Sequence, residues 1–357
     1  MPYDYMKVDD RRDAKWGYPG DVADNWNSPT IATFFADIMT PGLGQDEIDQ
    51  GRAIFEGAFE SMLSGLQMPP ELEAAGEWQE HWAPGCVEEP DAPPCRLHVR
   101  VPKQRASERV PCVMYYFAAG MGGKPDYFDF EIATYSAALG AVVIAPQYRV
   151  HPENKQPAQL NDLHAAYQWA LDNADELGID PDNIVLSGYS IGGMMALGLA
   201  FRLARHGITP RGVSCIAPPV DDRGLGKSAR ISYAHENLGC EEKEITWHSF
   251  FGSTLVAQPA LSPEIVPGHA EVEDLKGFAP VFMHIFESDP NRDEDLMFCQ
   301  KLLEADVTTS IHLWPGTNHA TFYSGPNYEL KGRFYAEVTQ NIKDMMDKDL
   351  RRPWTVK

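Results

Sequence analysis

The apolar positions follow two different periods along the 357-residue chain, and the change falls near residue 95. Before it, apolar residues recur at spacings of three, four and seven, which predicts a helix over residues 45–67 with one apolar face. These residues are Ile48, Phe55, Phe59, Met62 and Leu66. Asn27-Ser28-Pro29 predicts the start of a shorter helix over 30–39. Six prolines within residues 68–94 predict a loop or linker.

From residue 95 onward, short apolar segments alternate with amphipathic ones. Leu97, Val99 and Val101 alternate with polar residues and predict a strand with one buried face. Apolar runs predict further strands over 112–117, 141–145, 184–186, 213–217, 280–286 and 310–314. Helices are predicted over 162–174, 193–205, 294–304 and 334–346. Strands that alternate with helices indicate an α/β fold, in which a parallel sheet is covered on both faces.

Two stretches are extra to this α/β pattern. Residues 1–94 precede it, and residues 221–258 form a long connection in which 233–251 is predicted to be helical. We therefore expect a core of residues 95–357, interrupted by an insert over 221–258. The N-terminal segment, with its linker, and this insert are both expected to form a helical cap over the sheet.

The segment 184–193 carries the motif G-x-S-x-G between a predicted strand and a predicted helix. This is the setting of a nucleophile elbow, where Gly188 and Gly192 allow a turn tight enough to expose the hydroxyl of Ser190. The backbone N–H of Ile191 would then face the position at which an oxyanion forms. The alternative is an ordinary strand–turn–helix junction with an unreactive serine.

A serine hydroxyl needs a base, and the base needs a group that orients it. Asp289 follows the predicted strand 280–286, and His319 follows the strand 310–314. Both therefore leave the carboxyl ends of parallel strands, where such sheets place their sites. An isolated Asp or His at a strand end is usually a turn residue. The order Ser190, Asp289, His319 favours a catalytic triad instead.

Residues 111–319 resemble the hormone-sensitive-lipase-like family of α/β-hydrolase esterases. The resemblance rests on the elbow and on five segments in the family's order. These read Tyr148-Arg149-Val150-His151-Pro152-Glu153, Gly178-Ile179-Asp180-Pro181-Asp182, Leu261-Ser262-Pro263, Asp289-Pro290-Asn291-Arg292-Asp293-Glu294 and Pro315-Gly316-Thr317-Asn318-His319. The resemblance implies an α/β-hydrolase fold with a mostly parallel sheet and a helical cap, and Asp289 as the acid of the triad.

The chain departs from this family at two places. Phe117-Ala118-Ala119-Gly120 stands where the family has H-G-G-G, and by that match Ala119 and Gly120 supply backbone N–H groups to an oxyanion hole together with Ile191. Tyr189 and Ile191 replace the Asp and Ala of the family's G-D-S-A-G. The bulk of Ile191 leads to the hypothesis of a short-acyl preference.

Charge and composition restrict the partners. Thirty basic and 52 acidic side chains give a net charge of −22, which disfavours nucleic acids and anionic membranes. The N-terminal sequence has no basic segment followed by an apolar one, and no apolar run approaches the roughly 20 residues of a membrane span. We expect a cytoplasmic protein that acts on a small molecule, and self-association is left open.

The chain has six cysteines. Cys112, Cys215 and Cys299 lie in apolar patterns and are expected to be reduced core residues. The spacing H-x4-C-x8-C-x2-H loosely resembles a zinc site but matches no common zinc finger, so zinc is disfavoured there. Its members are His81, Cys86, Cys95 and His98.

The function predicted from these features is a serine carboxylesterase that works through an acyl-enzyme and requires no metal or organic cofactor. Two alternatives remain. One is a non-catalytic small-molecule receptor on the same scaffold, suggested by the altered oxyanion segment. The other is an amide or lactone hydrolase that uses the same three residues, because fold and triad do not fix the substrate.

Overall fold

A computed structural model of the chain describes residues 44–63, 68–118, 122–223, 225–226, 228, 262–287, 289–317, 319, 321–322 and 329–351. The helices predicted over 30–39 and 233–251 lie outside these residues, as do the first 43 residues and most of the insert. The cap assigned to residues 1–94 and 221–258 therefore stays a prediction.

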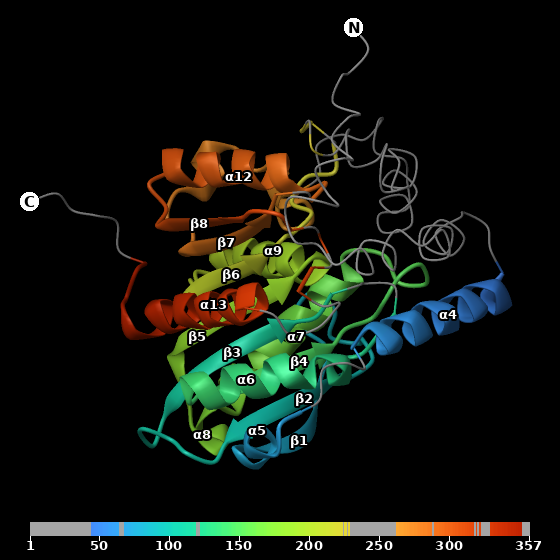
Figure 1. The fold of residues 1–357 in the computed structure, drawn as a ribbon, viewed down its shortest axis with the longest axis vertical. Coiled ribbons are helices and arrows are strands. Elements are labelled where there is room, and N and C mark those ends of the chain that lie inside the picture. Colours follow the sequence, from blue (N-terminus) through green and yellow to red (C-terminus); the bar gives the residue numbers. More distant parts are fainter. Residues whose placement is uncertain are drawn as a thin grey trace, which may run out of the picture.

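An eight-stranded sheet forms the centre of the molecule, in the order β1-β2-β4-β3-β5-β6-β7-β8 (Figure 1). The strands are β1 Gly76–Ala83, β2 Cys95–Pro102, β3 Val110–Tyr116, β4 Val142–Gln147, β5 Ile179–Tyr189, β6 Gly212–Ile216, β7 Val281–Phe286 and β8 Thr309–Trp314. β2 pairs antiparallel with both β1 and β4, and all pairs from β4 to β8 are parallel. The α/β fold with a mostly parallel sheet is confirmed.

Helices cover both faces of this sheet (Figure 1). They are α4 Gln45–Leu63, α5 Pro70–Ala74, α6 Asp129–Leu139, α7 Ala158–Asp172, α8 Ala174–Leu177, α9 Ile191–Arg205, α12 Arg292–Glu304 and α13 Glu329–Asp347, with short 3-10 turns η2 Pro125–Phe128, η4 Pro267–His269 and η5 Val272–Leu275. α6 contacts α13, and α7 contacts α9. β2 contacts both α6 and α7, and it is buried at every position except Arg96. The prediction that β2 has one buried face is therefore wrong, because both of its faces are covered.

The loop predicted for residues 68–94 is wrong in its first half. Pro70–Ala74 is helical and Gly76–Ala83 is an edge strand, so the sheet begins before residue 95. Six of the eight positions of β1 are partly or fully exposed, and its polar composition therefore carried no strand signal. α6 was not predicted, because its buried face includes Glu131, Tyr135 and Ser136 among the apolar residues.

No helix within the described ranges is long and apolar enough to cross a bilayer. The five cysteines of those ranges, Cys86, Cys95, Cys112, Cys215 and Cys299, are all buried and carry no disulfide. The expectation of reduced core cysteines at 112, 215 and 299 is confirmed.

Candidate active site

Ser190 occupies a tight turn between β5 and α9. Its backbone has φ 54° and ψ −127°, a conformation that L-residues rarely adopt. The surroundings fix this conformation: the Ser190 N–H donates to the Ile216 carbonyl at 2.8 Å, and its carbonyl accepts from the Met194 N–H at 3.1 Å. The strained turn lifts the side chain out of the strand, as a nucleophile elbow requires.

The two glycines of the motif are required by close backbone approaches. A Cβ on Gly188 would overlap the backbone of Gly192, and a Cβ on Gly192 would overlap the carbonyl oxygens of Tyr116 and Phe117. The first turn of α9 therefore packs directly against the end of β3. Only glycine permits this packing, which holds Ser190 beside the segment that follows β3.

Ser190, His319 and Asp289 form one hydrogen-bonded chain. His319 Nε2 lies 2.9 Å from Ser190 Oγ, and His319 Nδ1 lies 2.6 Å from Asp289 Oδ2. The Asp289 side chain is 1% exposed, whereas that of His319 is 16% exposed. Asp289 Oδ1 accepts a hydrogen bond from the Asn291 N–H at 2.8 Å, so the carboxylate is held on both oxygens. This arrangement favours the tautomer with the proton on Nδ1, which leaves Nε2 to accept the serine proton.

Each of the three side chains leaves the carboxyl end of its own strand: Ser190 after β5, Asp289 after β7 and His319 after β8. Because β5 to β8 are parallel neighbours, these ends meet at one edge of the sheet. The predicted residues are thus brought together.

Tyr189 is a further residue of the site, and the sequence analysis assigned it no role. Its hydroxyl donates to the backbone carbonyl of His319, and its ring packs near the His319 ring with centroids 5.6 Å apart. Burial raises the pKa of this phenol well above its usual value, so the hydroxyl stays protonated as a donor. Tyr189 therefore ties the loop after β8 to the elbow. The one sequence feature that marked this residue was its departure from the family motif G-D-S-A-G, in which Tyr189 takes the place of Asp.

Of the predicted oxyanion donors, Ile191 is the first residue of α9, where backbone N–H groups have no partner within the helix. Ala119 and Gly120 lie outside the described residues, so their role stays a prediction. Phe117, in place of the family's histidine, is fully buried and stacks on Tyr148 with ring centroids 4.3 Å apart. The Tyr148 hydroxyl donates to the Phe117 carbonyl at 2.7 Å, which anchors the start of the segment.

Helix α4 is bonded to the loops that leave β3 and β4. Glu56 Oε1 accepts a hydrogen bond from the Gly123 N–H at 3.0 Å, and Glu60 Oε1 accepts one from the Tyr127 hydroxyl at 2.9 Å. Arg52 pairs with Glu153 at 2.6 Å. The N-terminal helix is therefore attached close to the segment predicted to supply oxyanion donors.

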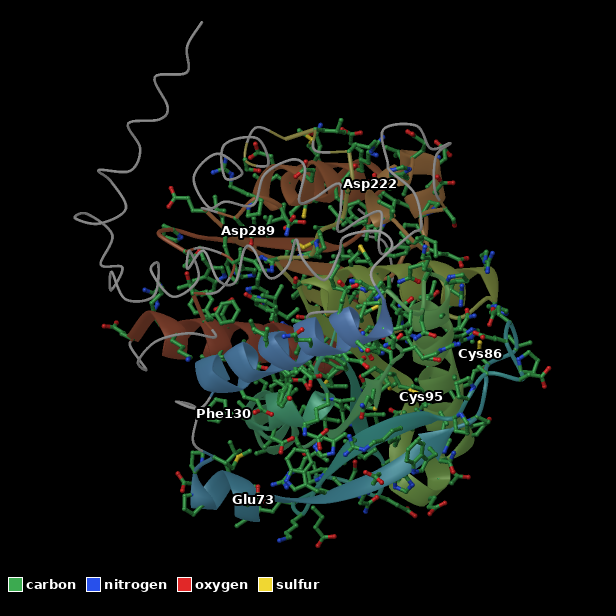
Figure 2. All side chains as sticks on the ribbon, turned by 90° about the vertical axis from the view of Figure 1, so that its right-hand side faces the viewer. Glu73, Cys86, Cys95, Phe130, Asp222 and Asp289 are labelled. Carbon is green, nitrogen blue, oxygen red and sulfur yellow. The ribbon has the colours of Figure 1, made fainter. Side chains whose placement is uncertain are left out.

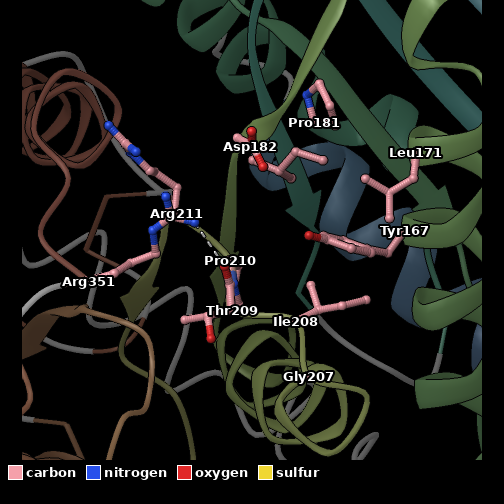
Figure 3. A pocket seen from close by; sticks show the side chains of 11 residues that line it. Tyr167, Leu171, Pro181, Asp182, Gly207, Ile208, Thr209, Pro210, Arg211 and Arg351 are labelled. Atoms are coloured by element: carbon pink, nitrogen blue, oxygen red, sulfur yellow. Dashed lines mark hydrogen bonds between the residues drawn. The ribbon is translucent and has the colours of Figure 1, made fainter.

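A cavity of about 470 Å³ lies elsewhere, near the amino ends of β5 and β6 (Figure 3). Tyr167, Ile208, Arg211 and Arg351 contribute to its lining. Arg211 and Arg351 both donate to backbone carbonyls and both pair with Asp349. These groups are occupied within the fold, and the cavity is at the opposite end of the strands from Ser190.

The set His81, Cys86, Cys95 and His98 does not converge. His81 approaches Trp169 of α7, whereas His98 bonds to Asp129 of α6 at 2.8 Å. His81 lies opposite Leu97, the neighbour of His98, so alternation across the pleat directs the two histidines to opposite faces of the sheet. The zinc spacing seen in the sequence therefore does not describe one site.

Comparison with known proteins agrees with this geometry. A family model described as the alpha/beta hydrolase fold matches residues 114–323. The chain belongs to this α/β-hydrolase family. It is 28% identical over 216 residues to carboxylesterase NlhH of Mycobacterium tuberculosis, a match that covers 59% of this chain and 66% of that protein. It is 28% identical over 229 residues to an ethyl acetate hydrolase of Pseudomonas putida, with 63% and 70% covered.

Solved structures resemble this α/β hydrolase over more of its length. A bacterial heroin esterase superposes with a TM-score of 0.74 at 25% sequence identity, which covers 88% of this chain and 97% of the esterase. An esterase of Pyrobaculum calidifontis superposes with a TM-score of 0.73, also at 25% identity. Both structures, like both sequence relatives, are named for ester hydrolysis.

Proposed function

We propose that this α/β hydrolase is a serine carboxylesterase. The observation that carries the proposal is the hydrogen-bonded chain from Ser190 Oγ through His319 to the buried carboxylate of Asp289, assembled beside a strained elbow. The carboxylesterase and ethyl acetate hydrolase names of the relatives support the same reaction class.

In the proposed mechanism, Ser190 attacks the ester carbonyl while His319 Nε2 takes its proton. The Ile191 N–H, with those of Ala119 and Gly120, stabilises the tetrahedral oxyanion. The protonated His319 then donates to the departing alcohol, which leaves the acyl group on Ser190. A water molecule deprotonated by His319 attacks this acyl-enzyme and releases the acid. Asp289 stabilises the imidazolium in both steps.

The proposal extends to substrate size and to the cap. A short acyl group is proposed from the bulk of Ile191 next to the nucleophile, and the ethyl acetate hydrolase relative is consistent with it. The bonds from α4 to Gly123 and Tyr127 support a cap that includes the N-terminal segment. The cytoplasmic location stays a prediction.

The test is hydrolysis of nitrophenyl acetate, butyrate and octanoate by the purified protein and by Ser190→Ala, with mass detection of a fluorophosphonate adduct. We expect turnover that falls with chain length, an adduct on Ser190, and loss of both in the variant. Ser187→Ala is the matched control, because Ser187 is a buried serine of β5 whose hydroxyl has no partner among the described residues. It should retain activity and the adduct.

Other outcomes separate the alternatives. Turnover that peaks with octanoate would contradict the short-acyl proposal alone. An adduct on Ser190 without ester turnover would direct attention to amides or lactones. The absence of both turnover and adduct would favour the receptor, which keeps the scaffold without the reaction.

A further inference from the structure

A second group of reactive side chains lies around the connection between β1 and β2. Figure 2 shows Cys86 and Asp289 on different parts of the fold. Cys86 and Glu88 belong to the connection between β1 and β2, His164 to α7, and His206 directly follows the end of α9. None of the four takes part in the proposed ester hydrolysis.

Three of these four donor groups converge, and the fourth contacts one of them. Cys86 Sγ, a Glu88 carboxylate oxygen and a His164 ring nitrogen all lie within 4.8 Å of one another. His164 Nδ1 is 2.7 Å from Glu88 Oε2, and His206 Nε2 is 2.8 Å from Glu88 Oε1. The two imidazole rings lie side by side, with centroids 5.1 Å apart. A thiol, a carboxylate and one imidazole therefore share one small volume, and a second imidazole adjoins it through the other carboxylate oxygen.

From this geometry we propose that Cys86, Glu88, His164 and His206 form a binding site for Zn²⁺. Zinc holds sulfur, nitrogen and oxygen ligands at about 2.0–2.3 Å, so the ligand atoms of a tetrahedral site lie about 3.3–3.8 Å apart. The two histidine–glutamate contacts would lengthen by about half an ångström to reach these values. Binding replaces the thiol proton by the metal, and that proton leaves to solvent.

The choice of metal follows from the donor set. A thiolate with two imidazoles selects zinc or another soft transition metal over Ca²⁺ and Mg²⁺, which prefer oxygen ligands. Cys86 and His164 are buried, whereas the side chains of Glu88 and His206 are 24% and 38% exposed. The inner half of the site is thus pre-formed, and the outer half offers an entry path.

A second cluster of possible metal ligands differs from the proposed zinc site in its charge balance. Asp221, Asp222 and His269 also lie within 4.8 Å of one another. There, however, the Arg223 guanidinium already pairs with Asp221, with Nε 2.8 Å from Oδ1. The Arg223 charge compensates that cluster, whereas no arginine or lysine is paired with Glu88 among the described residues.

A bound zinc ion would join three separate segments: the β1–β2 connection, α7 and the end of α9. Because the metal binds the folded state, zinc at about 100 times its dissociation constant should raise the melting temperature by about 5 °C. The effect would be on stability, since the site does not touch Ser190.

The experiment measures zinc content after dialysis against a zinc buffer, together with melting curves of the full chain in zinc and in chelator. The wild type should hold about one equivalent and show the stabilisation. Cys86→Ser should lose both, whereas Cys95→Ser, at a buried cysteine that begins β2, should keep both. Cobalt(II) should give a sulfur-to-metal charge-transfer band in the wild type that disappears in Cys86→Ser.

His206→Gln provides a second test at an exposed position, where misfolding is not expected to interfere. It should weaken zinc binding at least tenfold. The proposal is overturned if the wild type retains no zinc, or if Cys86→Ser retains as much zinc as the wild type. Loss of zinc in Asp222→Asn with retention in Cys86→Ser would assign the metal to the other cluster.

Discussion

The proposed triad and the Cys86 cluster (Cys86, Glu88, His164 and His206) both pair a histidine with a carboxylate at almost the same distance. His319 Nδ1 lies 2.6 Å from Asp289 Oδ2, and His164 Nδ1 lies 2.7 Å from Glu88 Oε2. The two pairs differ in what surrounds them. In the triad the carboxylate is buried behind the ring, whose second nitrogen faces a serine. In the cluster the carboxylate is partly exposed and is shared by two rings beside a thiol.

Under the two proposals, the same pair of residue types serves two kinds of chemistry. In the linear chain, the central imidazole can take a proton from the hydroxyl on one side while the carboxylate on its other side stabilises the resulting charge. Groups that converge on one volume can instead share a cation. Which arrangement arises is decided by the elements that carry the residues: strand ends in the first case, and a loop packed against two helices in the second.

The largest effect is expected from Asp289→Asn. The amide removes the charge that holds His319 and stabilises its protonated form, so kcat for nitrophenyl acetate should fall about 10⁴-fold. The measurement is steady-state hydrolysis, with circular dichroism to check the fold. Asp306→Asn is a suitable control, because Asp306 is exposed and its left-handed backbone conformation is one that Asn accepts. Activity within tenfold of the wild type would contradict the role of Asp289.

The triad residues are easier to predict from the sequence than the Cys86 cluster, for a physical reason. Ser190, Asp289 and His319 each follow a predicted strand, so the parallel sheet brings them together once its strands are known. The members of the Cys86 cluster come from three segments with no common spacing. The local spacing pointed instead to His81 and His98, which alternation across the pleat separates.

Most strands were predicted where burial leaves an apolar pattern. The strands β3, β4, β6 and β7 are almost wholly buried, as is the second half of β5, and these segments appear as apolar runs. The edge strand β8 was predicted although most of its positions are partly or fully exposed. The other edge strand, β1, carries mostly polar residues on its exposed positions and lies next to proline-rich sequence, so it was predicted to be a loop. The hydrogen bond from Tyr189 to His319 depends on tertiary contact alone, and no periodicity reports it.

Two buried histidines outside both regions should make the stability of the fold depend on pH. Burial, with a smaller effect of Arg52, lowers the pKa of His151 to about 3, and burial lowers that of His284 well below 6.5. The unfolded chain therefore binds more protons than the folded chain below about pH 6.5. Stability should be full well above that pH and fall as the pH decreases toward 3. His151 contributes about 1.4 kcal/mol per pH unit once the pH is well below 6.5, and His284 acts in the same direction.

Denaturant unfolding at pH 6, 5 and 4, where the unfolded imidazole is mostly protonated, measures this slope. His151→Gln should reduce it by about 1.4 kcal/mol per pH unit. An unchanged slope in the variant would show that His151 does not contribute.

A smaller effect is expected from Tyr189→Phe. The substitution removes the donor to the His319 carbonyl and keeps the packed ring, so it loses one hydrogen bond worth about 1 kcal/mol. If the bond positions His319, kcat should fall about fivefold with little change in KM. Steady-state kinetics should be compared with Tyr135→Phe, a buried tyrosine of α6, which should leave both constants unchanged. A rise in KM alone would contradict positioning and point to substrate contact.

The smallest effect on activity is expected from Glu88→Gln, which makes the same carboxylate-to-amide change beside an imidazole as Asp289→Asn. Here neither imidazole takes the proton of the proposed nucleophile, so kcat should stay within twofold of the wild type. Loss of the two charge-assisted contacts to His164 and His206 should lower stability by about 1 kcal/mol, because the Glu88 side chain is partly screened by solvent. Activity and denaturant unfolding of the two variants should be measured side by side in chelator. A large loss of activity in Glu88→Gln would mean that the cluster is coupled to the triad, and the contrast between a linear chain and a convergent set would no longer separate their functions.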